Sequence, residues 1–149
     1  MSQYEMIQKQ MAEIVPFAKY IGVEVTHVGP GEGAAELPET PTTVNHIASQ
    51  HAGALFTVGE AASGAALSGV FADRLLAVRP VAAEAKIAYK KIARGKITAT
   101  AKASAPAAEI IEKFEAEGKI AFDVNVSLKD QNDLEVATMT VAWHVKSLS

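Results

Sequence analysis

Apolar residues recur along the first half of the chain at two different periods. From residue 3 to residue 15 they repeat at helical spacing, which predicts an N-terminal helix within residues 1–15. Pro16 is expected to end or bend this helix. The apolar positions of this helix are Met6, Ile7, Met11, Ile14 and Val15. Residues 21–28 and 33–37 alternate loosely like strands around the turn residues 29–31, Gly-Pro-Gly, which predicts a hairpin.

The segment 49–70 differs from the first helix because apolar and small residues occupy nearly every position. A helix with this composition is expected to be buried on almost every face, with Ser49 capping its first turn. Glu60 is its only charged residue. A lone carboxylate in apolar surroundings is costly unless it has a partner or a function, so Glu60 is the first candidate for chemistry.

The C-terminal half reads as a series of strands. Residues 83–92, 96–104, 119–128 and 134–145 predict four strands, and residues 106–116 predict a short helix between the second and the third. A long helix surrounded by antiparallel strands explains why that helix is so apolar, and its small residues let the sheet backbone come close. The order of elements predicts the α+β class.

Composition supports a single domain that covers residues 1–149. The chain is 49% hydrophobic and 21% charged, as in ordinary globular proteins. A net charge of −3 predicts no nucleic-acid partner. The absence of cysteine excludes disulfides and thiolate chemistry, and the charged residues Glu5 and Lys9 argue against a signal peptide, so a cytoplasmic location is expected.

Membrane and metal functions have little support in the sequence. Residues 52–72 are long enough to span a bilayer, but Glu60 lies mid-span and Ala, Gly and Ser dominate there. His27, His46 and His144 show no metal-ligand spacing, so no metal site and no membrane association are expected.

The run from Asn45 through His51 and Gly53 to Glu60 resembles the hotdog-fold acyl-CoA thioesterases, above all the phenylacetate-pathway type and the related uncharacterised DUF4442 family. The resemblance extends over about residues 17–145. It implies an antiparallel sheet wrapped around a central helix, a coenzyme A thioester as substrate and no cofactor. It also implies paired active sites in a homodimer, with a homotetramer as the open alternative.

Two departures from the family pattern affect the chemistry. Ala52-Gly53 stands where many members have two glycines, and the acid is Glu60 where it is often aspartate. Ala52 keeps the backbone N–H that an oxyanion site would use. The additional methylene of Glu60 leaves both a general base and a nucleophile open as its role.

Helix geometry separates the candidate residues on one chain. Nine residues separate His51 from Glu60, which corresponds to a rise of about 13.5 Å and a rotation of about 900°. The two side chains therefore lie on opposite faces of the helix. If both take part in catalysis, the site must form between two copies of the chain.

The remaining candidates have a structural reading beside the functional one. The amides of Ala52 and Gly53 are predicted to hold an oxyanion at the helix start, although Gly53 alternatively serves close packing. Asn45 and His51 would orient the loop, the water or the carbonyl, or simply stabilise the loop. Ser63 shares a helix face with Glu60 and is a candidate for binding water, or a small residue in a crowded helix.

Basic residues cluster around the turn at residues 94–95. Tyr89, Lys90 and Arg94 are, together with Ser63, the predicted substrate-binding residues, and Lys91 and Lys96 lie beside this turn. These cations would bind coenzyme A phosphates, although a solvated turn explains each of them equally well.

Three functions remain after these considerations. The first is an acyl-CoA thioesterase that uses Glu60 as general base or nucleophile. The second is a non-catalytic hotdog protein that binds acyl-CoA or an acyl carrier. The third, a hydratase or dehydratase of the same fold, has the weakest support because its local pattern differs.

Overall fold

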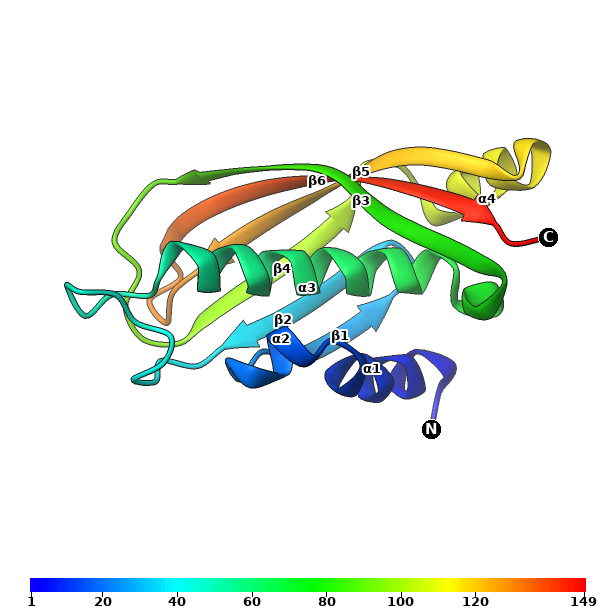
Figure 1. Ribbon diagram of the computed structural model, residues 1–149. Coiled ribbons are helices and arrows are strands. Elements are labelled where there is room, and N and C mark those ends of the chain that lie inside the picture. Colours follow the sequence, from blue (N-terminus) through cyan, green and yellow to red (C-terminus); the bar gives the residue numbers. More distant parts are fainter.

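A six-stranded antiparallel sheet wraps around the long helix α3 in the computed structural model, which describes residues 1–149 (Figure 1). The strands lie in the order β1-β2-β4-β5-β6-β3. The elements in chain order are α1 Gln3–Ile14, α2 Pro16–Tyr20, β1 Glu24–Gly29, β2 Glu32–Leu37, α3 Ala52–Val70, the 3-10 helix η1 Ala72–Ala77, β3 Val78–Tyr89, β4 Ile97–Ala103, α4 Ala107–Glu117, β5 Lys119–Lys129 and β6 Glu135–Ser147. This is the hotdog arrangement, so the predicted α+β fold is confirmed.

Close packing between α3 and the sheet depends on glycine. A Cβ atom on Gly33 of β2 would lie 2.6 Å from the carbonyl oxygen of Ala62, and one on Gly69 of α3 would lie 1.7 Å from the carbonyl oxygen of Gly29. Real side chains do not fit at such distances. The expectation that small residues let the sheet backbone approach the helix is therefore confirmed.

One stripe of α3 is not fully buried, contrary to the prediction of burial on almost every face. Most of the helix lies in the main core against the inner face of the sheet. The half-buried positions repeat at helical spacing; they are Phe56, Glu60, Ala61, Gly64 and Ser68. Glu60 therefore belongs to the stripe that the sheet leaves partly open.

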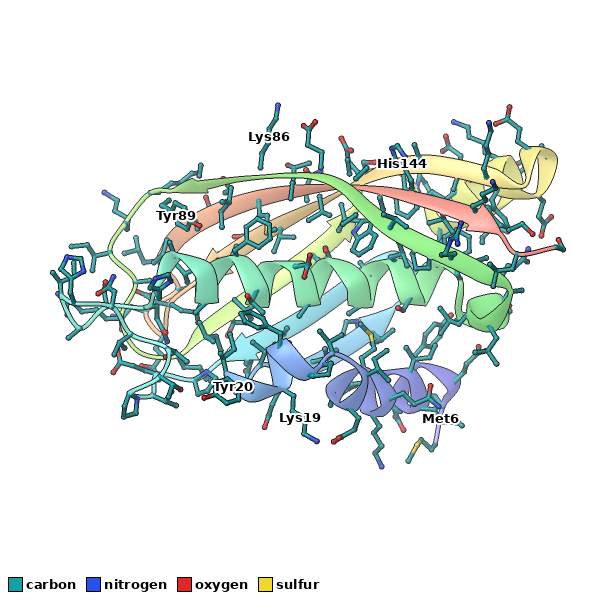
Figure 2. All side chains as sticks on the ribbon, in the orientation of Figure 1. Met6, Lys19, Tyr20, Lys86, Tyr89 and His144 are labelled. Carbon is teal, nitrogen blue, oxygen red and sulfur yellow. The ribbon has the colours of Figure 1, made fainter.

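The N-terminal helices cover the open side of α3 near β1. Ile7 of α1 packs with Val25 and Val28 of β1 and with Ala65 of α3. Figure 2 shows Met6, Lys19 and Tyr20 on the side of α1 and α2 that faces away from α3. No helix of the chain combines the length and hydrophobicity needed to cross a membrane.

Several predicted boundaries were wrong, and three of them have a clear physical reason. The helix predicted for 49–70 begins at Ala52, because His51 rather than Ser49 caps it. Pro16 starts the separate short helix α2, which the sequence pattern did not anticipate. Strand β3 begins five residues earlier than predicted and contains Pro80, which an edge strand tolerates because it needs no hydrogen bond on its free side.

Candidate functional site

Glu60 lines a largely apolar cavity of about 390 Å³ between α3, the α1–α2 segment and the inner side of β3 and β6. Its apolar walls come mainly from Met11, Ile14, Val15, Ala18, Val23, Leu67, Pro80 and Trp143. Glu60 and Lys19 are the only charged residues in the lining, and the Lys19 ammonium is paired with Glu13. The cavity therefore presents a single carboxylate that forms no ion pair with the one cation of its lining.

The carboxylate of Glu60 is free to act on a ligand. The side-chain hydrogen bond that reaches this residue goes to its backbone carbonyl, to which Ser63 Oγ donates at 2.8 Å. None of the ion pairs or side-chain hydrogen bonds of the chain uses the carboxylate oxygens of Glu60. Such a group in an apolar pocket is available to take a proton or to attack an electrophile.

Ser63 has a different environment from the one that its position on the helix predicted. Its hydroxyl is fully buried, donates to the Glu60 carbonyl and accepts a hydrogen bond from Trp143 Nε1 at 3.3 Å. The second of these contacts attaches α3 to β6. Ser63 is absent from the cavity wall, and its burial fits the alternative given for it above, a small residue in a crowded helix.

His51, Ala52 and Gly53 form the exposed N-terminal end of α3. His51 Nδ1 accepts a hydrogen bond from the Gly53 N–H at 2.8 Å, which requires the proton of the neutral imidazole to lie on Nε2. The Gly53 amide is therefore occupied, whereas the Ala52 N–H has no hydrogen-bond partner in the chain. One free backbone donor remains at the positive end of the helix dipole.

Asn45 organises the loop before this helix. Its Oδ1 accepts hydrogen bonds from the Ile47 N–H at 3.0 Å and the Ser49 N–H at 3.1 Å, and its Nδ2 donates to Ser49 Oγ at 2.9 Å. Ala48, inside this loop, has a φ of 59°, a left-handed conformation that is costly for alanine. These contacts of Asn45 stabilise the loop, which is the structural alternative given above for this residue.

Gln50 is a loop residue that the sequence analysis did not single out. Its buried amide donates from Nε2 to the Pro38 carbonyl at 3.1 Å and to the Gly95 carbonyl at 2.9 Å. It thereby joins two loops to the segment that carries His51. No periodicity or motif marks an isolated glutamine of this kind.

Tyr89 and Arg94, two of the four predicted substrate-binding residues, contact the end of α3 and its loop. The Tyr89 hydroxyl donates to the Ala52 carbonyl at 3.0 Å, and burial raises the pKa of this phenol above its ordinary value of 10.0. Arg94 donates from Nη1 to the Ala48 carbonyl at 3.3 Å. Lys90 forms an ion pair with Glu135 at 2.9 Å, so its charge is already compensated.

The structure therefore divides the predicted residues into two groups. Asn45, His51, Ala52, Gly53, Tyr89 and Arg94 lie around the N-terminal end of α3. Glu60 lies about 12 Å further along the helix axis, because eight residues separate it from Ala52. The carboxylate and the free amide of one chain are therefore too far apart to contact one small reacting group.

Solved structures with the same fold include several thioesterases. A Pseudomonas aeruginosa protein described as a probable thioesterase has a TM-score of 0.83 and 24% identity, with 96% of this chain and 95% of that chain covered. A Staphylococcus aureus thioesterase variant has a TM-score of 0.74 and 17% identity, with 89% and 99% covered.

The E. coli PaaI protein from the phenylacetic acid degradation operon has a TM-score of 0.69 and 20% identity, with 97% of this chain and 99% of that chain covered. These likenesses show the fold. Among curated proteins, none matches the sequence. The sequence model of DUF4442, a domain of unknown function, matches residues 4–145, and the chain belongs to that family.

Proposed function

We propose that the chain is a thioesterase that hydrolyses acyl-CoA thioesters, with Glu60 as its reactive carboxylate. The observation that carries this proposal is a single unpaired carboxylate in the wall of an apolar cavity of about 390 Å³. An acyl group fits the apolar walls, and Glu60 lies where a carbonyl group or a water molecule would be placed. The reaction needs no cofactor.

In the general-base form of the reaction, Glu60 takes a proton from a water molecule while the water oxygen attacks the thioester carbonyl. The resulting tetrahedral oxyanion collapses and breaks the C–S bond. The thiolate leaves and takes up a proton, which yields the free acid and the thiol. In the nucleophilic form, a carboxylate oxygen of Glu60 attacks the thioester carbonyl, the C–S bond breaks and the thiolate leaves. Water then hydrolyses the resulting acyl anhydride to the free acid and regenerates Glu60.

Stabilisation of the oxyanion requires a second copy of the chain. The free Ala52 N–H lies about 12 Å from Glu60 along the same helix, so a two-fold axis would supply this donor from the partner. Strand β3 supports such a pairing because it is twelve residues long, exposed at nearly every position and unpaired along one edge. Long exposed edges are normally covered.

Two variants of the Staphylococcus aureus thioesterase add support for the choice of residues. One structure carries a glutamine-to-alanine change and the other a glutamate-to-alanine change, at positions 15 residues apart. Asn45 and Glu60 have the same separation in this chain. In this chain we expect Asn45 to orient the loop and Glu60 to perform the chemistry, and these two residues have the same spacing as the two positions changed in that protein.

A hydrolysis assay with a panel of acyl-CoA thioesters of different length tests the proposal. Glu60→Gln is expected to lower kcat by about 10²–10⁴-fold, since it keeps the shape of the side chain and removes the base. Glu24→Gln, an exposed change on β1, removes the same charge and is expected to leave kcat unchanged. Equal hydrolysis by wild type and Glu60→Gln would show that Glu60 is not the reactive group.

Two further measurements separate the parts of the mechanism. Label in Glu60 after a single turnover in H₂¹⁸O would show the nucleophilic form, with water attacking the Glu60 carbonyl of the anhydride. Sedimentation of the chain as a monomer at micromolar concentration would contradict the shared site.

One observation favours a non-catalytic acyl-CoA binding protein as the second candidate. The Gly53 N–H is bonded to His51, which leaves one free donor where an oxyanion site usually has two. If no thioester in the panel is hydrolysed while calorimetry detects acyl-CoA binding, the binding function replaces the catalytic one.

A further inference from the structure

A second hollow, with a volume of about 560 Å³, lies on the outer face of the sheet, over β3, β5 and β6. Residues alternate along β3, so Pro80 and Ala82 face the Glu60 cavity whereas Arg79 and Val81 face the outer hollow. Figure 2 shows His144 on this outer side, away from α3. The hollow is therefore separated from the Glu60 cavity by the sheet itself.

Three basic residues lie directly opposite one another across this hollow. In the strand register Arg79 pairs with Lys146, and Lys146 pairs with Lys119. We call these three residues the cation row. Adjacent strands lie about 4.8 Å apart, so the row extends over about 10 Å. All three side chains are exposed, and none takes part in an ion pair of the chain.

The cation row is unfavourable without an anion. Like charges directly opposite each other on a sheet repel. On these three strands the nearest acids on the outer face are Glu84 and Asp123, which both pair with Ala142. Ala142 is four residues from Lys146 along β6, or about 13 Å away. Glu117 lines the hollow but forms no ion pair with the row. A protein of net charge −3 has thus gathered three cations and one acid in one hollow, with none of the cations in an ion pair.

The neighbouring residues narrow the chemistry of the ligand. Two residues further along the strands, Val81 and Ala121 both pair with His144. These three residues lie about 7 Å from the cation row. An exposed imidazole between two small apolar side chains offers a surface on which a planar ring can stack. A nucleoside phosphate has an aromatic base and a phosphoanion at a comparable separation.

We propose that the outer hollow binds a phosphorylated nucleoside, with its phosphates on Arg79, Lys146 and Lys119 and its base against Val81, His144 and Ala121. This chemistry has two sources, namely a free nucleotide and the nucleotide half of a coenzyme A compound. The proposal does not rest on thioesterase activity, because the hollow and the Glu60 cavity lie on opposite faces of the sheet.

Calorimetric titration at low ionic strength with ADP and with inorganic diphosphate tests the site. Both probes are expected to bind, ADP more tightly because its base adds contacts, and added salt should weaken both. Lys146→Gln is expected to raise Kd by about tenfold or more, since it removes a charge-assisted contact at the centre of the row. Lys102→Gln removes an equally exposed outer-face cation on β4 and should change Kd by less than about twofold, because its contribution is screened.

Thermal melting distinguishes a loss of binding from a loss of folding in these variants. Without ligand, Lys146→Gln should melt no lower than wild type, because it relieves repulsion within the row. Lack of ADP binding, or equal weakening by Lys102→Gln and Lys146→Gln, would overturn the proposal. Binding of a polyanion such as heparin without binding of ADP would also overturn it.

A parallel titration with coenzyme A identifies the source of the ligand. If Lys146→Gln weakens coenzyme A and ADP equally, the site holds the nucleotide half of a coenzyme A compound. If coenzyme A binding is unchanged while ADP binding is lost, the ligand is a free nucleotide. Both results support the site.

Discussion

Two glycines of α3 provide a matched test of how closely the helix approaches the sheet. Gly69 and Gly64 belong to the same helix, and replacement by alanine should favour the helical conformation equally at both, by about 1 kcal/mol. Their surroundings differ. A Cβ atom on Gly69 would lie 1.7 Å from the carbonyl oxygen of Gly29, whereas one on Gly64 would lie 3.6 Å from Met11 Cε, an ordinary contact.

The expected changes in stability therefore have opposite signs. The clash at Gly69 is with backbone, so the helix and the β1–β2 hairpin must separate by more than 1 Å to reach an ordinary contact, about 3.4 Å. Overpacking of this kind costs about 3 kcal/mol or more, of which the gain in helix propensity recovers about 1 kcal/mol. Gly69→Ala should lose about 2 kcal/mol or more, and Gly64→Ala should gain up to about 1 kcal/mol.

Urea unfolding followed by circular dichroism measures both free energies, and thermal melting gives an independent reading. A change of 1 kcal/mol corresponds to about 2–4 °C for a chain of this size. Gly64→Ala should therefore melt up to about 4 °C higher, and Gly69→Ala at least about 4 °C lower. If Gly69→Ala were as stable as wild type, the close approach of α3 to the Gly29 carbonyl would be refuted.

Two other predictions concern Ala48, in the loop before α3, and Glu135, in β6. Ala48→Gly should stabilise the chain by about 0.5–1 kcal/mol in urea unfolding, because glycine accepts the φ of 59° without strain, whereas Ala61→Gly within α3 should destabilise it. Hydrogen bonds from Ser127 and Lys90 lower the pKa of Glu135 below its ordinary value of 4.5. The ionised carboxylate of Glu135 therefore stabilises the fold above pH 4.5, and this contribution is lost as the pH falls through the lowered pKa. The unfolding free energies of wild type and Glu135→Gln should therefore converge under acid conditions. A difference that stays constant with pH would refute this assignment.

Most of the fold was predictable because its signals are local. The alternation of residues 119–128 and the apolar character of the central helix each depend on near neighbours, and both correspond to elements of the structure. The start of α3 was misjudged because Ser49 and His51 are both polar residues able to cap a helix. The choice between them depends on Asn45, which holds Ser49 in the preceding loop.

The candidate site was predictable only in part, because its surroundings come from distant segments. Glu60 is conspicuous as the one charge in its helix, yet its half-exposure results from α1, α2 and β3 leaving one stripe of α3 partly uncovered. The burial of Ser63 depends on Trp143, which lies 80 residues away in the chain. Neither environment has a sequence signal of its own.

The sequence by itself determined the period of each element, the lone carboxylate and the separation of His51 and Glu60 on opposite helix faces. These properties follow from backbone geometry over a few residues. Tertiary structure decided that Glu60 faces a cavity and that Arg79, Lys119 and Lys146 form one row. Contacts of this kind depend on strand register and helix packing between segments far apart in the chain, so no local pattern encodes them.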